Sequence, residues 1–145
     1  MKKLISTKTH GILDYLTAPT LLLLPRTLGL SKKVTTLLTG AALGILGYSV
    51  ITRYELGLFK ILPMKGHLTI DMINGAMLAV APFVLFDEAE RNPTLIALLL
   101  SLGAFEITTA SLTQMQPSPG TEDLMISDTL TAGLDTVKKA IGIGQ

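Results

Sequence analysis

The sequence predicts an all-α integral membrane protein folded as a four-helix bundle, and three observations carry this prediction. Hydrophobic residues make up 48% of the 145 residues and charged residues only 16%, whereas a soluble domain usually carries about a quarter charged residues. The mean hydropathy is +0.52. Apolar stretches of about 20 residues, the length that crosses a bilayer, recur along the chain. A net charge of +1 provides no basic surface for binding nucleic acid. The absence of cysteine excludes disulfides, thiolate metal ligands and cysteine nucleophiles.

The first apolar stretch, Thr9–Pro25, is the weakest of the four candidate spans. It contains His10 and Asp14, and Pro19 interrupts it, although membrane helices tolerate proline. Its basic start is also typical of a signal peptide. Because no small-residue cleavage site follows Leu24, we expect a retained helix.

The next three stretches are closer to ideal membrane spans. Val34–Thr52 contains no charge and is expected to continue to about Phe59. Lys65–Phe86 has ionisable groups only in its first two turns, and Pro93–Met115 contains a single acid, Glu106. Short connections between the four stretches predict antiparallel neighbours. The lysines and arginines of these connections favour a multi-pass protein of the bacterial cytoplasmic membrane, with both termini in the cytoplasm.

The chain divides into a membrane domain, residues 1–115, and a tail, residues 116–145. The sequence QPSPG at Gln116–Gly120 breaks the last span. Beyond it, apolar residues recur at helical spacing and predict a short amphipathic helix at about 127–142. Such a helix either lies in the membrane interface or packs on its own bundle.

The membrane domain matches itself at an offset of 57 residues. At this offset His10, Asp14 and Pro25 align with His67, Asp71 and Pro82, and Leu38 and Tyr48 align with Leu95 and Phe105. The repeats cover about 10–58 and 67–115, and each contains two helices. Because an even number of crossings restores the starting side, the halves should share one topology. A pseudo-twofold axis along the membrane normal is then expected.

The His-x-x-x-Asp pattern followed by Ala81-Pro82-Phe83 resembles the SPW-repeat integral membrane proteins, as does the stretch Tyr48–Leu58. In that family each repeat is a two-helix unit with Ser-Pro-Trp in its first helix. Here the motif reads Leu24-Pro25-Arg26 in one copy and Ala-Pro-Phe in the other. The resemblance covers residues 8 to 112. It implies a fold and no activity.

Ionisable residues inside a membrane span are costly and mark candidate sites. Histidine and aspartate four residues apart share one helix face. Because the two pairs occupy matching positions of the repeat, they should lie at the same depth in the membrane. We expect Arg53 to supply the counter-charge for an aspartate. The candidate polar layer or ligand site comprises His10, Asp14, His67, Asp71, Arg53, Tyr54, Glu55 and Glu106.

Several kinds of chemistry suit this layer. Imidazole and carboxylate ligands at His10, Asp14, His67 and Asp71 could hold zinc, iron or manganese. The two histidines could ligate a haem, or the acids and histidines could relay protons. Alternatively the groups bond one another and hold the bundle together. No catalytic constellation is recognised, and an enzyme is not favoured.

We therefore predict a non-enzymatic scaffold or subunit without a cofactor, and a metal-, haem- or proton-handling protein as the alternative. The expected partners of the protein are the lipid bilayer and either a second copy of the same chain or another membrane protein. No nucleic-acid partner is expected. Gly40, Gly44 and Gly47 permit close helix packing, which we expect inside the protomer rather than between protomers. Pro25 and Pro82 are expected at helix contacts as well.

Overall fold

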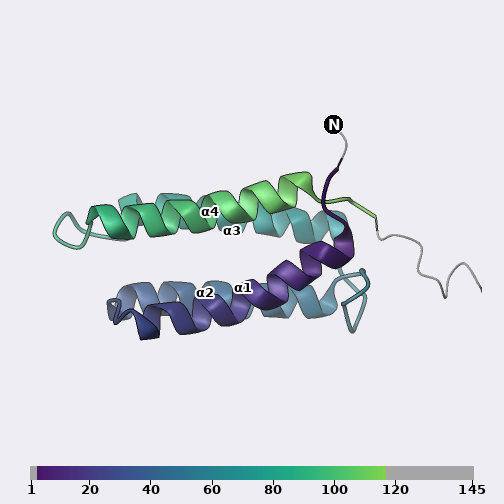
Figure 1. Cartoon of the computed structure of the whole chain (residues 1–145), viewed down its shortest axis with the longest axis horizontal. Helices are drawn as coiled ribbons and strands as arrows, with labels where there is room; N and C mark the ends of the chain where they lie inside the picture. Colours follow the sequence, from purple (N-terminus) through teal and green to yellow (C-terminus); the bar gives the residue numbers. More distant parts are fainter. Residues whose placement is uncertain (1–2, 117–145) are drawn as a thin grey trace, which may run out of the picture.

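The computed structural model describes residues 3–116, and this part of the chain forms four helices and no strand beyond isolated bridges. The helices are α1 (Thr7–Thr27), α2 (Lys32–Ile51), α3 (Met64–Val84) and α4 (Pro93–Leu112). α1 packs against α2 and α3 against α4, so that two hairpins form the two layers seen in Figure 1. The predicted all-helical fold is thus confirmed. The amphipathic helix predicted at 127–142 lies outside the described residues.

Helices α2, α3 and α4 are each long and apolar enough to cross a membrane. At 1.5 Å rise per residue, helices of this length cover about 30 Å, the thickness of the hydrocarbon core. α1 has the same length as α3, but it carries His10, Asp14 and two prolines. The structure is therefore that of a membrane protein with at least three apolar spans.

Both second helices end earlier than predicted, because a threonine turns the chain. Thr52 follows α2 and Thr113 follows α4, both with extended backbone at ψ 145° and 144°. Each threonine amide bonds a carbonyl three residues back. The expected continuation of the second span to Phe59 is therefore wrong, as is that of the fourth to Met115.

The segment after α2 folds back on the helix end instead of extending it. The Arg53 amide donates to the Leu62 carbonyl at 2.8 Å, and the Leu62 amide donates to the Ile51 carbonyl at 2.8 Å. Gly57 lies so close to the Thr52 carbonyl that a Cβ atom there would clash with it. This tight return brings the start of α3 beside the end of α2.

The start of α1 meets the end of α4 in the same way. Ile5 pairs with Thr113, and Leu62 with Thr52, in two parallel bridges. The Ile5 amide donates to the Leu112 carbonyl at 3.1 Å, and the Gln114 amide donates to the Ile5 carbonyl at 2.9 Å. The two hairpins are therefore joined at this end by matching backbone contacts.

The buried positions of the two hairpins correspond, but with two different offsets. The buried residues of α1 recur 57 residues later in α3, whereas those of α2, except Tyr48, recur 61 residues later in α4. The counterpart of Leu38 is thus Leu99 and not Leu95, and the alignment of the second helices at 57 is wrong. The four additional residues lie in the α3–α4 loop, Leu85–Asn92. The rotation that relates the halves stays a prediction.

Close helix packing occurs at glycines other than those predicted. A Cβ atom on Gly75 of α3 would lie 2.7 Å from the Gly103 carbonyl oxygen of α4, and one on Gly103 would clash with the Gly75 carbonyl. Around Gly40, Gly44 and Gly47 there is nothing within 4 Å of such an atom. The expectation that this face packs inside the protomer is therefore wrong. Pro25 and Pro82 are buried within their helices, as expected.

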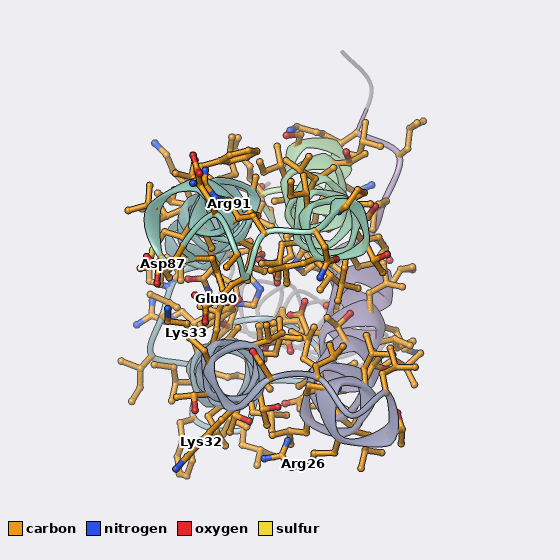
Figure 2. All side chains as sticks on the ribbon, turned by 90° about the vertical axis from the view of Figure 1, so that its left-hand side faces the viewer. Arg26, Lys32, Lys33, Asp87, Glu90 and Arg91 are labelled. Atoms are coloured by element: carbon orange, nitrogen blue, oxygen red, sulfur yellow. The ribbon has the colours of Figure 1, made fainter. Side chains whose placement is uncertain are left out.

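At the opposite end of the bundle the hairpins meet through one exposed ion pair. Figure 2 views this end and shows Lys33 of α2 directed at Glu90 of the α3–α4 loop. Their Nζ and Oε2 atoms are 2.7 Å apart. Lys33 also lies over the Phe86 ring, 5.3 Å from its centroid. Arg26 and Lys32 extend from the lower hairpin in the same view.

Candidate metal centre

Four buried side chains from α1 and α3 converge near the end of the bundle where the hairpins are joined. His10 and Asp14 lie on α1, and His67 and Asp71 occupy the same positions on α3. Their exposed fractions are 1%, 8%, 0% and 4%, respectively. One ligand atom from each lies within 4.8 Å of all the others. The predicted convergence of these four residues inside the bundle is confirmed.

The distances between the four groups are nearly equal. The two Nε2 atoms of His10 and His67 are 3.2 Å apart. His10 Nε2 lies 2.9 Å from Asp71 Oδ2 and 3.4 Å from Asp14 Oδ1, and His67 Nε2 lies 3.1 Å from Asp14 Oδ2 and 3.2 Å from Asp71 Oδ2. A tetrahedral ion with bonds of about 2.0 Å separates its ligand atoms by about 3.3 Å. The five quoted separations, which use both oxygens of Asp14, are close to this value, and the full set of one atom per residue lies within 4.8 Å, which is compact enough for one shared ion.

A threonine at the end of each second helix fixes the tautomer of one histidine. Thr113 Oγ1 lies 2.9 Å from His10 Nδ1, and Thr52 Oγ1 lies 2.8 Å from His67 Nδ1. Both hydroxyls donate their single proton to the carbonyl four residues back, at 2.6 Å. Each threonine must therefore accept a hydrogen bond from Nδ1–H. In the neutral imidazole, Nε2 then carries a lone pair that points into the centre.

Two donors from α2 position the carboxylates. Ser49 Oγ donates to Asp14 Oδ2 at 2.9 Å, and the Tyr48 hydroxyl donates to Asp71 Oδ1 at 2.6 Å. The Tyr48 ring also stands edge-on to His67, with centroids 4.8 Å apart. Hydrogen bonds of this kind to ligand side chains are typical of metal sites, where they hold the ligands in place.

Sequence reasoning did not identify these four supporting residues. It used Tyr48 in the repeat alignment, and Tyr48, Ser49 and Thr52 as part of the stretch Tyr48–Leu58, but it gave none of them a role in the site and did not consider Thr113. The signal was present, since Thr52 and Thr113 stand 61 residues apart, each directly after an apolar helix. It becomes visible only when the second helices are aligned with the correct offset.

Three further residues of the predicted layer, Arg53, Tyr54 and Glu55, lie outside the four-residue centre. Arg53 is exposed, and its Nε donates to the Lys60 carbonyl at 2.7 Å, so the prediction that it pairs with an aspartate is wrong. The extended turn at Thr52 directs the chain away from the bundle before Arg53. Glu55 accepts a hydrogen bond from Thr7 Oγ1 at 2.7 Å, and Tyr54 is buried with its ring 5.9 Å from that of His67.

The centre lacks a positive charge supplied by lysine or arginine. Among residues 3–116, the ion pairs of Asp14 and Asp71 involve only the two histidines. If both imidazoles are neutral, four acceptor atoms face one another around one point, which is repulsive. Two protonated histidines would instead bring two cations together at 3.2 Å, and a single protonated histidine would balance only one of the two aspartates. One divalent cation balances both aspartates and satisfies all four atoms.

The same distances argue against a haem ligated by both histidines. Axial ligands on opposite sides of an iron would stand roughly 4 Å apart, about twice a metal–nitrogen bond, with the macrocycle between them. His10 Nε2 and His67 Nε2 face each other directly at 3.2 Å. No macrocycle fits in that space.

The chain matches none of the family models, curated proteins or solved structures with which it was compared.

Proposed function

We propose that this protein is an integral membrane metal-binding protein whose centre holds one divalent transition-metal ion. The ligands are His10, Asp14, His67 and Asp71, and the ion is zinc, iron or manganese, the metals that combine imidazole and carboxylate ligands. The observation that carries the proposal is the threonine hydroxyl beside each Nδ1 atom, from which we infer that both Nε2 lone pairs face the two carboxylates. In a scaffold without a cofactor, the only counter-charges for the two aspartates among residues 3–116 would be protonated histidines.

Within this proposal the ion joins the two hairpins. Its ligands come equally from α1 and α3, and four protein ligands are characteristic of structural rather than catalytic sites. Removing the ion would leave the two buried carboxylates to be balanced by protonation of the histidines alone, which is costly inside a membrane. We therefore expect the bound metal to stabilise the folded bundle.

The membrane setting of the proposal follows the sequence predictions. The bundle would cross a bacterial cytoplasmic membrane four times, with both termini in the cytoplasm. Reporter fusions after Thr27 and Met64 should then report opposite sides, the first outside. Membership of the SPW-repeat family and an oligomer or second membrane protein as partner stay predictions.

Metal content of the purified protein tests the proposal. Protein prepared in mild detergent from metal-supplemented cells should contain bound zinc, iron or manganese. His67→Ala should lose at least nine tenths of it, because one of the four ligands is gone. Thr69→Ala is the matched control on the same helix, since the Thr69 hydroxyl is exposed and bonds only its own helix carbonyl.

A second measurement covers the case in which His67→Ala does not fold. Wild-type protein is stripped with a chelator and titrated with cobalt(II). Saturable visible bands of tetrahedral cobalt are expected. Folded wild-type protein that carries no metal and shows no cobalt bands would contradict the proposal.

A further inference from the structure

One buried acid takes no part in the four-residue centre. Glu106 lies on α4 with an exposed fraction of 7%, and neither of its carboxylate oxygens has a hydrogen-bond partner. An unpaired carboxylate is among the costliest groups to bury, above all inside a membrane span. Within residues 3–116 no protein group satisfies the Glu106 carboxylate, so a bound ion or water molecule is the candidate partner.

Glu106 borders a small cavity next to the centre. The cavity has a volume of about 10 Å³ and is lined by residues of α1, α2, α3 and α4, among them Glu106, Asp14, Asp71, His10, Tyr48 and Thr109. This volume accommodates one particle the size of a water molecule or a metal ion. Three carboxylates line the cavity, and no lysine or arginine does.

From this geometry we infer that the cavity is a second cation site. Its ion would be bound by carboxylate oxygens of Glu106, Asp14 and Asp71. The inference rests on the proposed function, because the two aspartates would be shared with the first ion. A carboxylate can bridge two ions through its two oxygens, and the first ion requires one oxygen from each aspartate. The result is a dinuclear centre with its ions about 3.5–4 Å apart, as in other two-metal sites.

The chemistry of the second site differs from that of the first. Its ligands are carboxylates, without an imidazole of its own, and such oxygen ligands suit manganese or magnesium better than soft metals. The site also exists on one side only. The counterpart of Glu106 in α2 is Ile45, which is apolar and buried. The second ion would thus be held by the second repeat alone.

Manganese stoichiometry tests the inference. Chelator-stripped protein in detergent is loaded with Mn²⁺, freed of excess ion, and analysed by elemental analysis and electron paramagnetic resonance. Wild-type protein should bind two manganese ions per chain with an exchange-coupled spectrum. Glu106→Gln, which keeps the shape of the side chain, should bind one ion with an isolated six-line spectrum. Glu106→Asp should keep part of the second occupancy.

The outcomes separate the two proposals. One uncoupled ion in wild-type protein, unchanged in Glu106→Gln, overturns the second site and leaves the first intact. Two ions in Glu106→Gln overturn the role of Glu106. No bound manganese in folded wild-type protein that still shows tetrahedral cobalt bands overturns the second site alone, and the absence of both manganese and cobalt bands overturns both sites. Because wild-type stoichiometry decides the inference, a variant that fails to fold does not prevent the test.

Discussion

The two hairpins bury equivalent positions but fill some of them differently. The histidine and aspartate of the first helix and the threonine after the second helix are the same in both. At the closest helix contact, α1 and α2 bury Ala18 and Ala42, where α3 and α4 have Gly75 and Gly103. The shared residues are those that bond across to the other hairpin. These bonds between the hairpins are therefore made by the same residues in both halves. The close glycine contact between two helices and the additional acid, Glu106, occur in the second half alone.

The largest effect is expected where the second hairpin differs in packing. Gly103→Ala places a methyl group against the backbone carbonyl of Gly75, which cannot move without separating the helices. Overpacking of this kind costs about 1–3 kcal/mol, and the rigid backbone favours the upper end. Denaturation in mixed detergent, followed by circular dichroism, measures the loss.

Gly44→Ala is the matched control for this substitution. Nothing lies within 4 Å of a Cβ atom there, so stability should stay unchanged or rise by up to about 1 kcal/mol from helix propensity. Equal losses for the two variants would mean that the close contact between α3 and α4 does not distinguish the hairpins.

The next prediction concerns what the hairpins share. Thr52→Val and Thr113→Val each remove the acceptor of one Nδ1–H bond while keeping the shape of the side chain. Loss of such an outer partner typically weakens metal binding 10–100-fold, and both variants should fall in that range. Competition with a chelator of known affinity measures the change, with Thr69→Val as control. A strong effect in only one variant would show that the two histidines are not equivalent.

The smallest effect is expected at the opposite end, where the inserted residues lie. The Lys33 ammonium holds the pKa of Glu90 below its ordinary value through a hydrogen bond. A lowered carboxyl pKa stabilises the fold at neutral pH, and this contribution is lost as the pH falls through the folded-state pKa. Because Lys33 and Glu90 are both partly solvated, Lys33→Ala should leave the midpoint of denaturation nearly unchanged. A loss comparable to that of Gly103→Ala would mean that this pair, and not the buried layer, joins the hairpins.

Composition and spacing were sufficient to predict the helices and the four central residues. A chain this apolar has few alternatives to membrane helices, and the duplicated His-x-x-x-Asp pair sets both the face and the depth of its residues. The ends of the helices were less predictable. Thr52 leaves the helix where its hydroxyl meets His67, a residue of another helix, and local sequence contains no trace of that contact.

The glycine contacts between helices were also not predictable from local sequence. Gly40 and Gly44 form a motif within one helix, yet the motif does not say which face meets a neighbour. Gly75 and Gly103 form a pair only across two helices, so that no local pattern links them. Likewise a four-residue insertion in a loop shifts the alignment of everything that follows it, and apolar residues are too common to reveal the shift.

The pairing of Ile5 with Thr113 has a consequence for how the protein is made. His10 leaves the ribosome before Thr113, which orients its ring, because Thr113 lies 103 residues later in the chain. During synthesis α1 is therefore made before Asp71 and Thr113, the residues that bond His10. The centre can form only after α4 has been inserted. A chain truncated before Thr113 lacks the hydroxyl that bonds His10, so the four-residue centre can be complete only when all four helices have been made.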